Sequence, residues 1–266
     1  MEAQTKKELA QLYKTLGIVQ KYAHALGIMS FDFETAAPRE ARAEEAETMS
    51  YLSNEAFKLE NSKKMKALTE SLYEKRDELD ALDRRLVEKR YEDYLKTKNV
   101  TPKKQLEWSM IVNQAYIDWL EAKEKADFSL FAKSLGDIVT MSRELVALRE
   151  KPLPGLYDNL LDDCEKGVLT ADLDPFFEEL KTGLMELLGR IRQSKHSIRR
   201  DFLSRPVPIH KQERFSRYLL EMNGYDYDRG YLSTTEHPFT IPIAKNDARV
   251  TTHYHEDMFL SNVFSV

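Results

Sequence analysis

Residues 225–257, YDYDRGYLSTTEHPFTIPIAKNDARVTTHYHED, differ in composition from the rest of this 266-residue chain. They are rich in Tyr, Thr, Ile and Val, and polar and apolar side chains alternate between turn-forming residues. This pattern is typical of short β-strands. The sequence predicts two strands, TIPIA and ARVTTHY, on either side of residues 245–247. Pro242 restricts the first of them to a sheet edge or an irregular strand.

Residues 1–224 carry the pattern of successive amphipathic helices. The first helix is predicted from about Thr5 to Gly27, because its apolar side chains recur every three or four residues. Prolines and turn residues then divide the chain into roughly nine helices, one of them opening at Asp174-Pro175. The predicted fold class is mainly α: an elongated multi-helix groove or bundle with a small β-hairpin or sheet near residues 231–252.

Composition excludes several classes of protein. Lys and Arg number 40 against 45 Asp and Glu, so a net charge of -5 argues against a nucleic-acid binder with a basic face. The single cysteine, Cys164, rules out a disulfide framework. No stretch has the apolar length of a membrane span or a signal peptide. We therefore expect a cytoplasmic protein without nucleic-acid or membrane partners.

Two acidic segments have alternative interpretations. Asp32 and Glu34, in SFDFETAAPRE, are either carboxylates near a cleft or loop residues that cap the next helix, and sequence favours the second. Residues 156–167, LYDNLLDDCEKG, contain four carboxylates, but their spacing differs from that of an EF-hand loop. A surface connection is the simpler prediction there, with Cys164 as a small packed residue.

Histidines gather at the end of the chain. His253 and His255 would point to the same side of a strand, and Glu256 completes a His-x-x-Glu spacing known among zinc ligands. The alternative is an exposed strand end, because a catalytic zinc needs a third protein ligand and the other histidines are far away in sequence. His237 precedes a proline and is held extended, either facing a ligand or bonding to the backbone.

Asp247, Arg249 and Thr251 share one face of the second predicted strand. An aspartate can hold the guanidinium so that it recognises a carboxylate. A structural ion pair on a small sheet is the alternative, and spacing alone favours it.

Taken together, these motifs closely resemble the Taq-type metallocarboxypeptidase family. That family carries an HPF motif, here His237-Pro238-Phe239, followed by DxRxT, here residues 247–251. FDFETAAPREARAEEAETMSYLS is similar to the family's segment after its first helix, with Phe31 in place of a tryptophan. LYDNLLDDCEKG is similar to its YDxLLDxYEPG-type segment, with departures at residues 164 and 166.

The resemblance implies a zinc-dependent enzyme, with cobalt as a possible substitute, that releases single residues from the carboxyl ends of peptides. In the complete enzyme an HExxH motif supplies zinc ligands and a general base, and the enzyme is a homodimer. The implied substrate-binding or pocket residues are His237, Pro238, Phe239, Asp247, Arg249 and Thr251.

The sequence contains no HExxH, so the resemblance implies an amino-terminal fragment without catalytic or metal-binding residues of its own. We expect a single partial domain, residues 1–266, with a helical part (1–224), a small β region (225–254) and the start of a truncated active-site helix (256–266). We also expect the chain alone to lack peptidase activity and tight zinc binding. The alternatives are a helical interaction or assembly module, and a different zinc enzyme that uses His253, His255 and Glu256.

Overall fold

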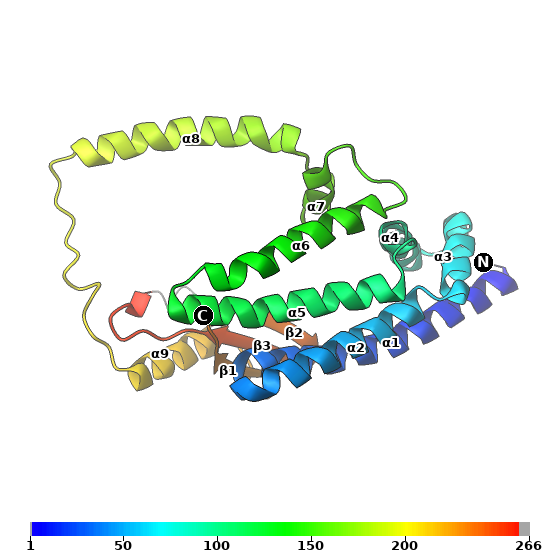
Figure 1. Ribbon diagram of the computed structural model, residues 1–266, viewed down its shortest axis with the longest axis horizontal. Coiled ribbons are helices and arrows are strands. Elements are labelled where there is room, and N and C mark those ends of the chain that lie inside the picture. Colours follow the sequence, from blue (N-terminus) through cyan, green and yellow to red (C-terminus); the bar gives the residue numbers. More distant parts are fainter. Residues whose placement is uncertain (1, 261–266) are drawn as a thin grey trace.

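The computed structural model describes residues 2–260 as long helices and one small sheet (Figure 1). The helices are α1 (Ala3–Thr35), α2 (Arg42–Glu60), α3 (Lys63–Glu74), α4 (Ala81–Thr97), α5 (Pro102–Lys125), α6 (Ser129–Ala147), α7 (Leu156–Cys164), α8 (Thr170–Gln193) and α9 (Ile209–Met222). The strands are β1 (Gly230–Thr234), β2 (Thr240–Ala244) and β3 (Asp247–Thr252). The predicted fold class, mainly helical with a small sheet near residues 231–252, is confirmed.

Helix α1 is longer than the sequence predicts. It runs for 33 residues to Thr35, beyond the predicted end at Gly27. The residues after Gly27 contain no helix breaker until Pro38, and the carbonyl of Asp32 accepts the N–H groups of residues 36 and 37 at 2.9 Å. Asp32 and Glu34 therefore lie in the last turn of α1, so the prediction that they belong to a connecting loop is wrong.

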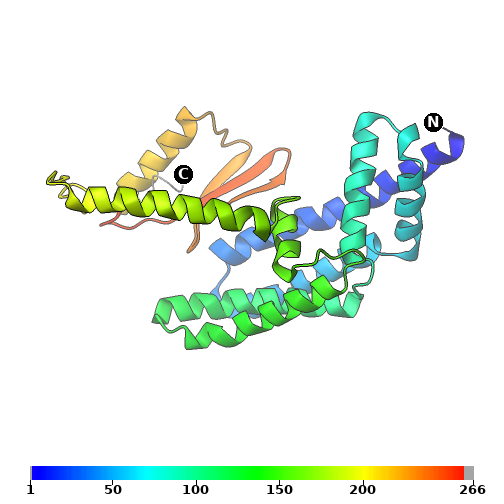
Figure 2. The same cartoon turned by 90° about the horizontal axis from the view of Figure 1, so that it is seen from above.

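The helices form a layered arrangement that extends from α1. Helix α2 packs on α1, α5 on α2, and α6 on α5, so these four helices lie side by side along their length (Figure 1). Helices α3 and α4 cross the amino-terminal end of α1 (Figure 2). A buried apolar cluster joins them there, formed by Leu9, Leu12, Met65, Leu72, Leu79 and Val87.

The sheet has the strand order β1-β3-β2, with β1 parallel and β2 antiparallel to the central strand β3. Residues 235–239, which include the HPF motif, therefore pass over the carboxyl end of β3 on their way to β2. One face of the sheet packs on α1, where Ile243 meets Gly27. The other face contacts α9 through a cluster of Leu220, Leu232 and Val250.

Gly230 allows a close approach at the start of β1. A Cβ atom there would lie 2.2 Å from the Tyr225 hydroxyl and 2.7 Å from the Ala248 carbonyl oxygen. The Tyr225 hydroxyl donates a hydrogen bond of 2.5 Å to that carbonyl. Only glycine leaves room for this bond, which ties the segment after α9 to β3.

Helix α8 begins at Thr170, earlier than the predicted start at Asp174. The N–H of Leu169 donates to the Asp172 carboxylate, and the N–H of Thr170 donates to the Asp158 carboxylate. These two bonds cap the helix ahead of Pro175, which lies inside it.

No residue of α8 is buried, and the helix stands apart from α5 and α6 (Figure 1). Its apolar side chains, each more than two-fifths exposed, are Phe176, Phe177, Leu180, Leu184, Met185, Leu187, Leu188 and Ile191. They form the largest set of exposed apolar side chains on any helix between residues 2 and 260. No helix or strand of that part of the chain packs extensively against α8.

The helix predicted over residues 256–266 is only partly described. Residues 259 and 260 are helical, and residues 261–266 lie outside the described part of the chain. Among residues 2–260, no helix combines the length and the apolar character that crossing a bilayer requires.

Candidate functional site: a pocket at the end of the first helix

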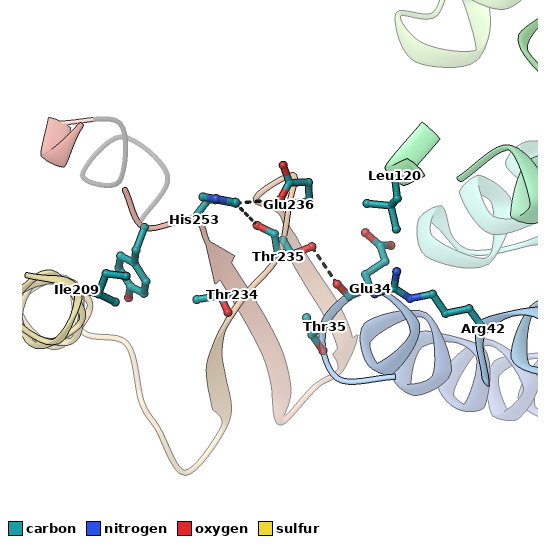
Figure 3. Close-up of a pocket in the computed structure, with 10 residues that line it drawn as sticks. Glu34, Thr35, Arg42, Leu120, Ile209, Thr234, Thr235, Glu236 and His253 are labelled. Carbon is teal, nitrogen blue, oxygen red and sulfur yellow. Dashed lines mark hydrogen bonds and ion pairs between the residues drawn. The ribbon is translucent and has the colours of Figure 1, made fainter. Parts of the chain in front are cut away.

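A pocket lies where the carboxyl end of α1 meets α5, α9 and the β1–β2 connection. Its volume is about 450 Å³. Figure 3 shows Glu34 and Arg42 on one side and His253 with Glu236 on the other. The pocket is lined by Glu34, Thr35, Arg42, Leu120, Ile209, Thr234, Thr235, Glu236, His253 and Tyr254. Residues distant in sequence therefore converge on one concave surface.

Polar contacts fix the wall formed by the β1–β2 connection. The Thr235 hydroxyl donates to the Glu34 carbonyl oxygen at 3.1 Å, which attaches the connection to α1. His253 Nδ1 donates to the Thr235 carbonyl oxygen at 2.9 Å. Lys123 of α5 forms an ion pair of 2.7 Å with Glu236, and this contact holds the pKa of the Glu236 carboxyl below its ordinary value.

Burial dominates the electrostatics of the other wall. It raises the pKa of Glu34, although the nearby hydroxyls of Tyr116 and Ser30 and the His237 ring lower it in part. Burial also raises the pKa of Tyr116 to about 12, and the negative charge of Glu34 adds to this shift. Tyr116 therefore remains protonated at neutral pH and is available as a hydrogen-bond donor.

Arg249 lies on the sheet face that packs against α1. Its Nε and Nη2 atoms each donate to an Asp247 carboxylate oxygen at 2.9 Å. Its guanidinium also stacks on the Phe31 ring, 4.9 Å from the centroid, an arrangement that is attractive for a cation over an aromatic face. The Arg249 fork is thus already engaged, and Phe31 fixes its plane.

The HPF motif packs against the same Phe31 side chain. The Phe239 ring lies 6.2 Å from that of Phe31, edge to face. The Thr251 hydroxyl accepts from the Phe239 N–H at 2.8 Å and donates to the Phe239 carbonyl oxygen at 3.2 Å. Thr251 is fully buried, so this pair of bonds fixes where the β1–β2 connection crosses the sheet. His237 is exposed on that connection.

The histidine pair has an arrangement that does not suit a metal. The rings of His253 and His255 stack with centroids 4.3 Å apart, and His253 Nδ1 is bound to a backbone carbonyl. Between residues 2 and 260, no group of three or more His, Cys, Asp or Glu side chains is placed to hold a metal ion. The donor set of the described chain does not fit a zinc site, which needs three converging protein ligands.

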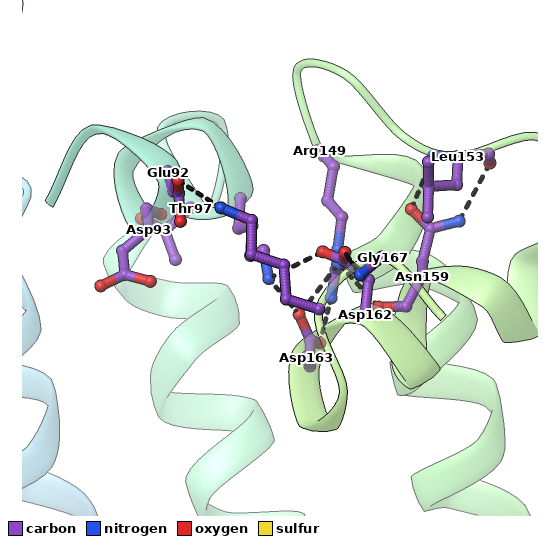
Figure 4. Close-up of polar contacts among 11 residues, drawn as sticks. Glu92, Asp93, Thr97, Arg149, Leu153, Asn159, Asp162, Asp163 and Gly167 are labelled. Atoms are coloured by element: carbon purple, nitrogen blue, oxygen red, sulfur yellow. Dashed lines mark hydrogen bonds and ion pairs between the residues drawn. The ribbon is translucent and has the colours of Figure 1, made fainter. Parts of the chain in front are cut away.

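The acidic segment at residues 156–167 forms a separate polar network (Figure 4). Arg149 and Lys96 both bind the Asp163 carboxylate, and Lys166 binds Glu92 of α4. The buried Asn159 side chain bonds to both backbone groups of Leu153.

This network attaches α7 to α4 and α6 and has the character of a surface connection. The carboxylates that a calcium loop would need are engaged by cations and N–H groups. Cys164 is exposed, so the prediction that it is a packed residue is wrong.

The structure brings together only some of the residues singled out from sequence. Asp247, Arg249, Thr251 and Phe239 meet at the Phe31 contact, and Glu34 lines the pocket. Sequence reasoning missed the residues that α2 and α5 contribute. They stand in ordinary helical sequence, and only the packing of α2 on α1 and of α5 on α2 could reveal them.

Acid should reveal the contribution of the Asp247–Arg249 pair to stability. The Arg249 guanidinium lowers the pKa of Asp247, so the stabilisation is fully present above about pH 3.9, the ordinary Asp value. It is lost as the pH falls through the lower pKa of the folded state. We expect Asp247→Asn to cost about 1 kcal/mol at pH 7, because the pair is partly exposed. This cost should shrink towards zero near about pH 2.

Urea unfolding of both proteins across this pH range checks the expectation. Asp137→Asn, which alters an exposed pair with Lys133 on α6, is the control and should have little effect at any pH. A cost of Asp247→Asn that stays constant down to the lowest pH would contradict the assignment.

Comparisons with known proteins agree on one family. The family model described as Carboxypeptidase Taq (M32) metallopeptidase matches residues 11–266. The protein named Carboxypeptidase 1 from Bacillus subtilis (strain 168) is 33% identical over 99% of this chain and 52% of its own length. Thermostable carboxypeptidase 1 from Thermus thermophilus is 36% identical over 64% of this chain and 35% of its own length.

Solved structures share the fold. The crystal structure of a protein called BsuCP has a TM-score of 0.93 and 31% identity, and covers 97% of this chain and 52% of that one. A Pyrococcus furiosus carboxypeptidase has a TM-score of 0.80 and 26% identity, covering 100% of this chain and 52% of its own. The arrangement of helices and sheet is therefore that of known carboxypeptidases.

The chain belongs to the Taq-type, or M32, metallocarboxypeptidase family. It spans about half the length of the curated and solved relatives that match nearly all of it.

Proposed function

We propose that this chain forms the amino-terminal half of a zinc-dependent carboxypeptidase that releases C-terminal amino acids from peptides. The observation that carries the proposal is the convergence of three segments on one aromatic contact. Phe31 of the first helix touches Phe239 of HPF and Arg249 of DxRxT. The family match gives this convergence its chemical meaning, because the matching relatives are named as carboxypeptidases.

In this proposal the chain binds and orients peptide and does not itself cleave it. Arg249, held by Asp247 and Phe31, organises the sheet side of the groove. Thr251 fixes the HPF segment, and His237, exposed on the β1–β2 connection, faces the substrate side. These roles depend on rigid placement, which the bonds to the backbone and the ring contacts supply.

Zinc belongs to the complete enzyme in this proposal, with cobalt as a substitute. The described residues do not offer a fitting donor set, and none of the six histidines stands in an HExxH sequence. When bound, the metal polarises the carbonyl group that is attacked. The chain alone is therefore expected to hydrolyse no peptide and to bind no zinc tightly.

The exposed apolar face of α8 supports a role for a second polypeptide half. BsuCP superimposes on 97% of this chain, so α8 occupies the same place in a protein about twice as long. A face of this size is normally covered in a folded protein. We propose that the carboxy-terminal half of the enzyme covers it, that the complete enzyme is a cytoplasmic homodimer, and that its substrate is peptide.

The same α8 face favours a second candidate, a helical assembly module without catalysis. Such a module would use the apolar side chains of α8 to bind a partner chain unrelated to peptidases. The two candidates differ in one measurable outcome. Only the first predicts peptidase activity when the chain is joined to the second half of a carboxypeptidase.

The proposal is tested with a blocked peptide and two proteins. Purified 1–266 with added zinc or cobalt should release no C-terminal amino acid, whereas Bacillus subtilis Carboxypeptidase 1 in the same assay serves as the active control. A chimera that joins this chain to the remaining half of that relative should regain release. An inactive but folded chimera would refute the proposed function, and chelator-sensitive release by 1–266 alone would refute the claim that it is inactive.

A further inference from the structure

Two opposite charges in the pocket at the end of α1 have no ion pair within residues 2–260. Glu34 and Arg42 both line the pocket, and Figure 3 shows them side by side without a bond between them. Glu236 on the opposite wall is different, because Lys123 neutralises it.

Nε of Arg42, beside these charges, is buried and lacks a hydrogen-bond partner in the described chain. A buried donor without a partner costs about 1–3 kcal/mol, and such groups in native proteins commonly mark the place of a missing water or ligand. The Tyr116 hydroxyl is already engaged with Glu34 and Thr235, so Arg42 is the donor left without a partner.

Two aliphatic side chains line the pocket on opposite walls (Figure 3). Leu120 of α5 and Ile209 of α9 contribute aliphatic side chains to its lining. The volume of about 450 Å³ lies within the range of small-molecule sites, roughly 300–1,000 Å³. An anion alone would face the carboxylate of Glu34, and a cation alone would face Arg42. The arrangement therefore suits a ligand that carries both charges and an apolar group.

We propose that this pocket binds the zwitterion of a free apolar α-amino acid. Glu34 accepts hydrogen bonds from the ammonium group, and the Arg42 guanidinium donates to the carboxylate. Leu120, which lies beside Glu34 (Figure 3), contacts the side chain. The inference rests on the proposed function in one respect, because a free amino acid is what a carboxypeptidase releases. A released amino acid that stays in this pocket would compete with the peptide substrate for binding.

Titration calorimetry with chain 1–266 and three ligands tests the site. L-leucine carries both charges, N-acetyl-L-leucine lacks the ammonium and L-leucinamide lacks the carboxylate. Leucine should bind at least about tenfold more tightly than either analogue. Equal binding of the three ligands, or no binding of leucine at millimolar concentration, would overturn the proposal.

Charge-removing variants assign each contact separately. Glu34→Gln should weaken the binding of leucine by about tenfold or more. It should leave the binding of N-acetyl-L-leucine unchanged, because that analogue has no ammonium group to contact Glu34. Arg42→Gln should weaken the binding of leucine to a similar extent and leave the binding of L-leucinamide unchanged, because that analogue has no carboxylate. Such selective effects cannot come from general misfolding. Arg39→Gln, which removes an exposed arginine paired with Glu124, is the matched control and should bind all three ligands as the unaltered chain does.

The two proposals fail in different ways. Binding is measured without turnover, so a chain that binds leucine while the chimera is inactive would refute only the carboxypeptidase function. An active chimera in which leucine neither binds nor inhibits would refute only the amino-acid site. If both variants lost the binding of all three ligands equally, the assignment of Glu34 to the ammonium group and Arg42 to the carboxylate would also be overturned.

Discussion

Replacing Phe31 by alanine is expected to lower the free energy of unfolding by about 3–5 kcal/mol. Phe31 is 5% exposed, and its ring contacts those of Tyr231 and Phe239 as well as the Arg249 guanidinium. Alanine removes all three contacts at once and leaves a cavity between α1 and the sheet. The sheet should therefore loosen from α1 while the distant α3–α4 pair remains folded.

Urea unfolding measures the total loss, and amide hydrogen exchange locates it. The matched control is Phe33→Ala, which removes an equally buried ring two residues further along α1. The Phe33 ring contacts that of Tyr116 on α5. Faster exchange in β3 is expected for Phe31→Ala, and faster exchange in α5 for the control. If both variants affect β3 equally, Phe31 has no special role in attaching the sheet.

The helical part of the fold could be predicted because its signals are local. Apolar side chains at helical spacing and prolines at the breaks place most helices within a few residues. Errors arose where a tertiary contact decides an end. Helix α8 starts early because Asp158, from a different helix, caps Thr170. Strand β1 was not predicted as a strand, because its pairing with β3 joins residues far apart along the chain.

The candidate site was predictable only in its local part. Asp247, Arg249 and Thr251 share a face because strand residues two apart do so in any sheet. Glu34, Arg42 and Tyr116 come from three different helices, and nothing in their sequence neighbourhoods marks them. Only packing shows that one carboxylate and one guanidinium are left unpaired beside a buried hydroxyl. That information belongs to the arrangement of α1, α2 and α5.

Replacing Leu12 by alanine is expected to cost about 2–5 kcal/mol, at the opposite end of α1. Leu12 is completely buried and lies in one apolar cluster with Met65, Leu72 and Val87. At 33 residues, α1 is about 50 Å long at 1.5 Å per residue, so this cluster is remote from the pocket. The loss should appear as faster amide exchange in α3 and α4, with β3 unchanged.

The exposed Leu82 on α4 provides the control, because it is 77% exposed and Leu82→Ala should cost less than about 0.5 kcal/mol. Leucine binding by the Leu12→Ala protein, measured where it is still folded, should equal that of the unaltered chain. Faster exchange in β3, or weaker binding, would show that α1 transmits changes along its whole length. The helical arm and the pocket would then be one cooperative unit, and Phe31 would couple the sheet to all of it.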